Sequence, residues 1–288
     1  KSYEKTDSGL LRYAHVLPRL TKDTTDRNRT SPFAFTGNKF EFRMLGSTTN
    51  ISCPNVMINT AVAETIDRFA TALENSKNVE EDAKKLIRET YLAHRRIVFN
   101  GNGYSEEWTE EAKKRGLSNI TDTPAALERY TDEKNVALLT KYGVYSAEEI
   151  AARKEILLDN YAKTISIEAN TMLEMVRREV LSAAVNFSAK LSHVVKDKVT
   201  CGVSATTETD LLRRVAALTD AIYAGSDRLE KAAAEAKKAV GTSALAAAYR
   251  NKVVPAMESL RASCDELETI TPRELWKMPT YSDLLFSV

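Results

Sequence analysis

Between Ser146 and Cys201 the chain contains neither glycine nor proline, and this stretch constrains the fold more than any other feature. Ser146 is followed three residues later by Glu149, the spacing of a capping box at the start of a helix. Apolar residues then recur every three or four positions, which predicts one helix or two nearly continuous helices of about 45–50 residues. Unbroken, such a helix extends on the order of 70 Å. It cannot bury its apolar stripe alone, so it must pack against other helices.

Two apolar runs later in the sequence are the predicted partners of this helix. Their members are Leu211, Val215, Leu218, Ile222 and Leu229, then Val253, Met257, Leu260, Cys264 and Leu267. Spacings of four and three alternate through both runs, which is typical of heptad packing. Gly241 separates the runs as a stop and Ser243 can cap the second helix, so we expect an antiparallel helical hairpin. Pro255 should kink the second helix or mark its true start.

Most glycines and prolines lie before residue 145, where the elements should be shorter. Residues 10–45 alternate turn clusters with brief apolar runs, which predicts strands and loops. A helix should begin near Pro54, and a second should span about residues 79–97. After the turn at residues 100–103, Ser105 can cap a short helix that ends at Gly116.

Charge and composition exclude several classes of protein. Lys and Arg number 41 against 40 Asp and Glu, so no global field would draw the chain to nucleic acid or to an anionic membrane surface. The three cysteines have no short spacing between them, so we expect reduced thiols and no zinc site. No apolar run approaches the roughly 20 residues of a membrane span, and residues 1–7 are too polar for a signal peptide. We therefore expect a soluble, cytoplasmic protein.

The chemistry predicted from residue types is concentrated in residues 26–43. On a strand over residues 38–44, alternation would send Lys39, Glu41 and Arg43 to one face and apolar side chains to the other. A solvated surface strand would show the same pattern. Upstream, however, Arg27 and Arg29 lie in a short loop with amide and hydroxyl side chains, a composition suited to binding phosphate or carboxylate.

The segment from Asp26 to Arg43 resembles the Asn-Arg-Ser/Thr loop and the following Glu-x-Arg strand of glutamine synthetases. Its Ser-Pro-Phe-Ala-Phe-Thr-Gly-Asn form is similar to the type III branch, as are residues 99–105 and the closing segment 276–286. The resemblance covers essentially the whole chain. It implies an α+β, mainly α fold in which residues 1–100 end the catalytic domain with short antiparallel strands. Residues 101–272 would form a helical C-terminal domain, and residues 273–288 an apolar docking tail.

The resemblance further implies an ATP-dependent ligase that makes glutamine from glutamate and ammonia through a glutamyl phosphate. Glu41 would bind the active-site Mg²⁺ or Mn²⁺, for which a carboxylate oxygen is a suitable ligand. Arg43 would hold the substrate carboxylate or the transferring phosphate, and Arg29 would contact the ATP phosphates. Arg27 and Lys39 are further candidates on the nucleotide side. A large ring-shaped homo-oligomer is the assembly that the family implies.

The chain lacks several residues that the resemblance to glutamine synthetases would require for a complete active site. The family's other metal-binding glutamates, its metal-binding histidine and its amino-terminal domain should precede residue 1, and His15 does not replace them. Shorter family members carry another arginine after the loop, where this chain has the apolar residues 32–35. We therefore expect the chain to be inactive by itself.

Several other features have structural interpretations. His15, His94 and His193 are far apart with no acid at ligand spacing, which favours structural roles. The Asn-Gly-Asn-Gly turn at residues 100–103 could hold an anion at the start of the next helix, but no Walker lysine comes after it. For the helical region the alternative to an enzyme is a non-catalytic oligomerisation or scaffold module.

Overall fold

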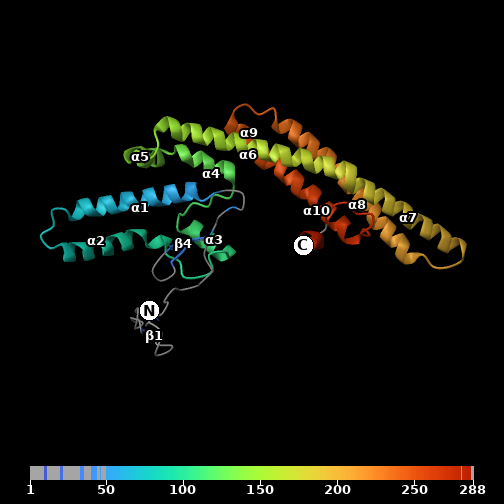
Figure 1. Cartoon of the computed structure of the whole chain (residues 1–288), viewed down its shortest axis with the longest axis horizontal. Helices are drawn as coiled ribbons and strands as arrows, with labels where there is room; N and C mark the ends of the chain where they lie inside the picture. The colour runs from blue at the N-terminus through green and yellow to red at the C-terminus, as the bar shows by residue number, and fades with distance from the viewer. Residues whose placement is uncertain are drawn as a thin grey trace. The chain divides into compact units, whose positions relative to one another are not determined.

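The computed structural model describes residues 10–11, 20–21, 33–35, 40–43, 46, 50–279 and 281–286. The chain forms two compact units, Lys1–Asn119 and Ile120–Val288. Both units are mainly helical in their described parts (Figure 1).

The strands of the first unit form two short antiparallel pairs. β1 (Leu10–Leu11) pairs with β2 (Leu20–Thr21), and β3 (Phe33–Phe35) pairs with β4 (Phe40–Phe42). In the second pair the register places Ala34 opposite Glu41. The prediction of short strands before residue 45 is confirmed for these four segments.

Helices α1 (Ser52–Leu73) and α2 (Val79–His94) begin where the sequence predicted. Proline suits the first turn of a helix because its missing N–H would be unpaired there, and Pro54 occupies that turn of α1. Asn78 caps α2 by accepting from the backbone N–H of Glu81. The apolar stripe of α1 is nevertheless largely exposed, with Val62 at 49% and Ile66 at 61%. Two helices bury only the seam between them, so a wider stripe stays at the surface.

The first unit ends in a short helix fixed by its cap and by aromatic stacking. After the single-turn helix η1 (Arg95–Ile97), α3 (Glu106–Lys114) begins at Ser105, whose hydroxyl accepts from the backbone N–H of Trp108. The rings of Phe99 and Trp108 stack with centroids 4.3 Å apart. Gly116, at φ +69°, lies just after the helix in the left-handed region that favours glycine. The predicted cap and stop of this helix are confirmed.

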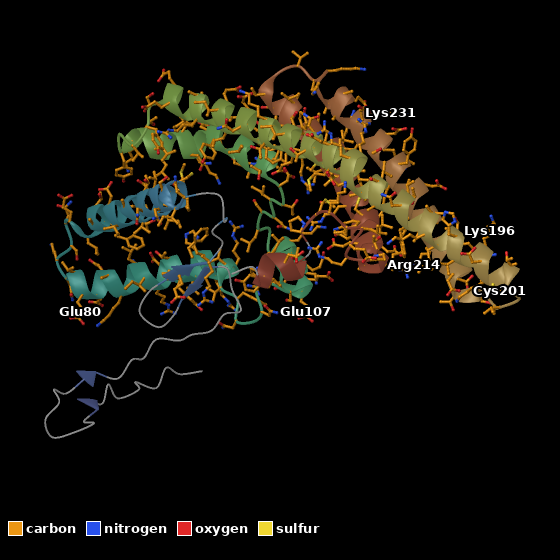
Figure 2. The ribbon with its side chains drawn as sticks, turned by 45° about the vertical axis from the view of Figure 1, so that its right-hand side comes forward. Glu80, Glu107, Lys196, Cys201, Arg214 and Lys231 are labelled. Atoms are coloured by element: carbon orange, nitrogen blue, oxygen red, sulfur yellow. The ribbon has the colours of Figure 1, made fainter. Side chains whose placement is uncertain are left out.

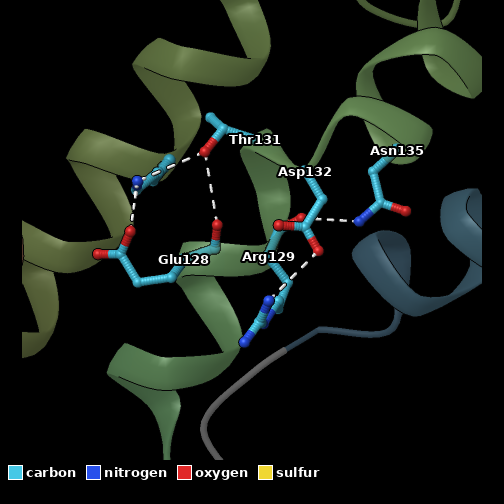
Figure 3. A network of polar contacts seen from close by, with 6 residues as sticks. Glu128, Arg129, Thr131, Asp132 and Asn135 are labelled. Carbon is cyan, nitrogen blue, oxygen red and sulfur yellow. Dashed lines mark hydrogen bonds and ion pairs between the residues drawn. The ribbon is translucent and has the colours of Figure 1, made fainter. Parts of the chain in front are cut away.

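The second unit opens with two short helices that the sequence patterns did not reveal. They are α4 (Thr123–Glu128) and α5 (Glu133–Lys141), joined by the single turn η2 (Arg129–Thr131). A polar network holds this corner together (Figure 3). In it Lys154 pairs with Glu128 at 2.6 Å, and the side-chain amide of Asn135 donates to the Arg129 carbonyl at 2.7 Å.

The long glycine- and proline-free stretch is one helical path with a local widening. α6 (Ala147–Met175) leads through a π-helical turn, η3 (Val176–Val180), into α7 (Leu181–Thr200). Both hydrogen bonds of the predicted capping box form: the Ser146 hydroxyl accepts from the Glu149 N–H, and the Glu149 carboxylate accepts from the Ser146 N–H. The predicted long helix is therefore confirmed, with a π-helical turn that the periodicity did not reveal.

The remaining helices pack against this path. α8 (Thr206–Ala236) is followed by Gly241 at φ +89°, α9 (Thr242–Ala248), the π-helical turn η4 (Tyr249–Val253) and α10 (Val254–Ile270). Pro255 lies in the first turn of α10, directly after the π-helical turn η4, and the backbone is helical on both sides of it, so it marks a local change in a continuing helical path and not a free helix start. Arg214 pairs with Glu266, which places the start of α8 beside the end of α10, and Glu235 pairs with Lys252, which places the end of α8 beside η4.

The core of the second unit lies between these helices. Val215, Ile222 and Leu229 of α8 are fully buried, as are Val253 of η4 and Leu267 of α10. Fully burying a side chain of this size contributes about 1.5–3 kcal/mol. The two runs predicted from spacing therefore supply a large part of the apolar core, together with buried residues of α6 and α7.

The carboxyl-terminal segment docks at its start. Trp276 is 4% exposed and belongs to the core, and Arg273 donates to its carbonyl oxygen at 2.9 Å. Arg273 also pairs with Asp283 of α11 (Tyr281–Phe286) at 2.7 Å. Leu284 and Leu285 remain 67% and 74% exposed, however. The prediction of a docked tail is thus confirmed for Trp276 and wrong for these two leucines, because the short helix is anchored through a polar pair.

Candidate functional site

The predicted chemical motif lies on and just after β4, where two charged side chains contact each other. Arg43 donates from Nε and Nη2 to Glu41 Oε2, at 3.2 and 2.9 Å. Side chains two residues apart on an extended strand project from the same face, so the backbone itself brings this pair together. The prediction that Glu41 and Arg43 share a face is confirmed.

The pair is partly exposed, which limits its contribution to stability. The Arg43 side chain is 19% exposed and that of Glu41 is 37% exposed. Ion pairs that water can screen contribute about 1 kcal/mol or less. Both donors of the guanidinium go to the same oxygen, Glu41 Oε2, so the contact is not the fork-to-fork geometry in which each carboxylate oxygen accepts one bond. The pair therefore adds little to stability, and a ligand-binding role for it stays a prediction.

The opposite face of β4 differs from the sequence prediction. Alternation predicted that Phe40 and Phe42 would face the core, but they are 64% and 37% exposed. Alternation assigns side chains to two faces of a strand, whereas burial requires another layer of structure over one of them. In the described residues, packing does not bury this face.

Three further predicted site residues, Arg27, Arg29 and Lys39, lie outside the described residues. Their convergence with Glu41 and Arg43 on one site therefore stays a prediction.

The residues present supply only part of a metal site. Among the described residues no three His, Cys, Asp or Glu side chains are gathered as a metal would require. Glu41 fits as one carboxylate ligand, but a hard divalent cation needs about six oxygen ligands. His94 and His193 are exposed on their helices, and His15 lies outside the described residues. The part of the chain that the structure describes thus forms no complete metal centre.

A hollow lies at the end of α2, and its lining includes Asn100 of the turn for which the sequence left an anion site open. It has a volume of about 590 Å³ and is lined by Tyr91, Arg95, Arg96, Val98, Asn100 and Arg115. Arg95 and Arg96 are adjacent in the sequence, and this basic pair was the other sequence feature that could have pointed to the hollow. The sequence could not show that Arg115 lies beside them after the intervening turn.

Comparisons with known proteins give the family. Residues 82–199 match the model described as "Glutamine synthetase C-terminal domain". The chain is 38% identical to a glutamine synthetase of Butyrivibrio fibrisolvens and 36% identical to a type-3 glutamine synthetase of Dictyostelium discoideum, each over 278 residues and 93% of the chain. A glutamine synthetase of Bacteroides fragilis (strain YCH46) is 33% identical over 281 residues, 94% of the chain. The chain belongs to the glutamine synthetase family.

The chain spans only part of these glutamine synthetases. It covers 39% of the length of the Butyrivibrio protein and 38% of each of the other two. The segment matched by the family model begins in α2 and ends in α7, so it contains the hollow beside Arg95, while Glu41 and Arg43 precede it. The resemblance to glutamine synthetases inferred from residues 26–43 is thus confirmed by matches over nearly the whole chain.

Membrane spans are absent from the described helices. None of them combines the length and apolar character needed to cross a bilayer.

Proposed function

We propose that this chain forms the carboxyl-terminal part of a glutamate–ammonia ligase. In that reaction the side-chain carboxylate of glutamate attacks the γ-phosphorus of ATP, and ADP leaves. Ammonia then attacks the acyl carbon of the glutamyl phosphate, phosphate leaves, and glutamine is formed. The observation that carries the proposal is the contact between Glu41 and Arg43 on the strand whose sequence resembles the Glu-x-Arg strand of this family.

Each proposed role follows from the chemistry of the side chain. Glu41 supplies one carboxylate ligand to Mg²⁺ or Mn²⁺, which would neutralise phosphate charge when bound. Arg43 orients the substrate carboxylate or the transferring phosphate through its planar fork of donors. Arg29 contacts the ATP phosphates, where positive charge stabilises phosphoryl transfer, and Arg27 and Lys39 assist on the nucleotide side.

The proposal includes partners beyond this chain. Its relatives are more than twice as long, so the remaining metal ligands and the amino-terminal domain would come from the rest of the protein. On this proposal the chain alone is inactive, and the whole protein works in the cytoplasm as a large ring-shaped homo-oligomer. Residues 1–100 would complete the catalytic domain, residues 101–272 would form the helical domain, and residues 273–288 would form the tail.

The test is ATP- and ammonia-dependent glutamine formation by the intact source protein. Glu41→Ala should lower the rate at least about 100-fold, since even the outer partners of a metal site change activity 10- to 100-fold. Glu110→Ala, on the exposed surface of α3, is the matched control and should retain full activity. Wild-type activity in the Glu41 variant, with the same assembly mass, would refute the proposed role.

A second function is favoured by the second unit alone. Residues 120–288 build their own core from α6, α7, α8 and α10, as a structural module would. If the chain serves only as an oligomerisation or scaffold module, Glu41→Ala will change neither the assembly mass of the intact protein nor its rate of glutamine formation. The same assay, combined with the native mass, separates the two functions.

A further inference from the structure

The hollow at the end of α2 gathers arginines on a cavity of a size suited to a small ligand. Its volume of about 590 Å³ lies within the roughly 300–1,000 Å³ of small-molecule sites. Its lining is mainly polar, with Arg95, Arg96 and Arg115 as its charged members. We propose that this hollow binds a small phosphate-bearing molecule through Arg95 and Arg96, with Arg115 fixing the wall behind them.

Arg115 is held in place by contacts on several sides. Its Nε donates to Glu111 Oε1 at 2.6 Å, and its Nη1 donates to the carbonyl oxygen of Val98 at 2.8 Å and to that of Arg96 at 3.3 Å. These bonds tie the segment after α2 to the end of α3. The donors of the Arg115 side chain are thus used by hydrogen bonds within the protein, and its role is to position the backbone at Arg96.

Aromatic packing makes the same wall rigid. The Arg115 guanidinium carbon lies 5.6 Å from the ring centre of Trp108 and 6.0 Å from that of Phe99, within the range of cation–π contact. A Cβ at Gly101 would stand 2.6 Å from the Phe99 ring, so a larger residue there would force the ring to shift. The polar hollow is therefore bordered by a turn with little freedom to collapse into it.

Arg95 and Arg96 differ from Arg115 because their side chains have no polar partner among the residues that the structure describes. In the described part of the chain, no carboxylate or other acceptor receives a hydrogen bond or ion pair from either guanidinium. The carboxylate nearest in the network, Glu111, already neutralises Arg115. The hollow therefore carries the unbalanced positive charge of two guanidinium groups.

The charge and geometry favour phosphate over a simple carboxylate. Two guanidiniums from adjacent residues can each offer a fork of donors, which a dianion with three terminal oxygens can accept together. A monocarboxylate can accept only one such fork. Tyr91 and Asn100 add a hydroxyl and an amide to the lining as further donors.

The position of the arginines at a helix end does not account for the hollow. Positive side chains are favourable near the carboxyl end of α2, but that interaction is satisfied by side chains spread in solvent. The interaction of positive side chains with the end of a helix requires neither the fixed turn nor the other lining residues, Tyr91 and Asn100. The inferred site also goes beyond the proposed ligase chemistry, since none of the residues that line it has a role there.

Two measurements on the full chain test the site. Calorimetric titration at low ionic strength should show that pyrophosphate binds with a dissociation constant on the order of 1 mM or below. Arg95→Gln and Arg96→Gln should each weaken binding about tenfold, since each removes one charge-assisted fork. Arg68→Gln in α1 removes the same charge away from the hollow and should leave the affinity unchanged.

Arginine footprinting separates this site from phosphate contacts elsewhere in the chain. Pyrophosphate should protect Arg95 and Arg96 from phenylglyoxal, measured by peptide mass, while Arg68 reacts at the same rate with and without it. Arg96→Lys keeps the positive charge but lacks the guanidinium's fork of donors, so a loss of pyrophosphate binding in this variant would be due to the missing fork. The lysine and glutamine variants should have the same melting temperature, so a difference in binding would not reflect a difference in stability.

Three outcomes would overturn the proposal. The first is unchanged labelling of Arg95 and Arg96 at saturating pyrophosphate. The second is an unaltered affinity in both glutamine variants. The third is equally tight binding of glutarate at this site, which would reassign it to dicarboxylates. The proposal is supported if pyrophosphate protects Arg95 and Arg96 from labelling and if each glutamine variant binds it about tenfold more weakly.

Discussion

Gly225 of α8 lies so close to Leu260 of α10 that a Cβ built on the glycine would stand 3.1 Å from Leu260 Cδ1. Leu260 is itself 1% exposed, so its side chain has little room to move aside. The missing side chain at Gly225 therefore sets how near the two helices approach. This contact lies midway between the Arg214–Glu266 and Glu235–Lys252 pairs.

Enlarging Gly225 should destabilise the second unit in proportion to the added volume. We expect Gly225→Val to lower the free energy of unfolding by about 1–3 kcal/mol, the usual cost of overpacking a core. Gly225→Ala should cost less, because its better helix propensity returns about 1 kcal/mol. Urea unfolding monitored by circular dichroism measures both. Equal stability for the valine and wild-type proteins would show that the interface is loosely packed.

The Glu128–Lys154 pair of the α4–α6 corner should make stability depend on pH (Figure 3). Hydrogen bonds from Lys154 and Ser243 hold the pKa of the Glu128 carboxyl below its ordinary 4.5. A carboxyl with a lowered folded-state pKa stabilises the fold above its unfolded pKa, and this contribution is lost as the pH falls through the folded value.

Glu128→Gln should therefore lower the free energy of unfolding at pH 7 by up to about 1 kcal/mol, because the half-exposed pair is screened by water. The difference from wild type should shrink as the pH falls below about 4.5, where the wild-type carboxyl also becomes neutral. Urea titrations from pH 3 to 7 measure this, with Glu110→Gln as control. A difference that stays constant over that range would contradict the assignment.

The three cysteines should differ in reactivity. Cys53 and Cys201 are exposed, and Cys201 lies at the turn that joins α7 to α8 (Figure 2). Burial raises the pKa of the Cys264 thiol to about 11, and the charge of Asp265 adds to this effect. At pH 8 only roughly one Cys264 in a thousand would be the reactive thiolate.

We therefore expect an aromatic disulfide reagent to modify two thiols of the native chain quickly and the third only after denaturation. Cys264→Ala should abolish the slow phase and leave the fast one unchanged. Rapid modification of all three thiols would mean that the helix packing around Cys264 in α10 opens readily.

Replacing Arg43 by lysine tests whether the proposed ligase uses a fork of donors or only a positive charge. Arg43 contacts Glu41 through two nitrogens, whereas lysine offers a single ammonium. We expect Arg43→Lys in the intact protein to lower kcat/KM for glutamine formation by about 100-fold or more, in the range seen when one preorganised donor is lost. The exposed Arg88→Lys is the control, and a loss of less than threefold at Arg43 would show that charge alone suffices.

The sequence by itself determined the elements whose signals are local. The absence of glycine and proline between Ser146 and Cys201, with the capping box at its start, determined the long helix. Ser105 and Pro54 marked helix starts because a cap or a missing N–H acts within one turn. Strand alternation likewise placed Glu41 and Arg43 on one face without knowledge of any other element.

Only the tertiary structure decided which apolar faces are buried and which distant residues meet. Val62 and Ile66 recur at helical spacing just as Val215 and Ile222 do, yet the first two are exposed and the last two are fully buried. Periodicity defines a face but does not supply the element that covers it. The meeting of Arg115 with the carbonyl of Arg96 depends in the same way on how the intervening turn folds. Burial and convergence are relations between separate segments, and local sequence patterns do not encode those distances.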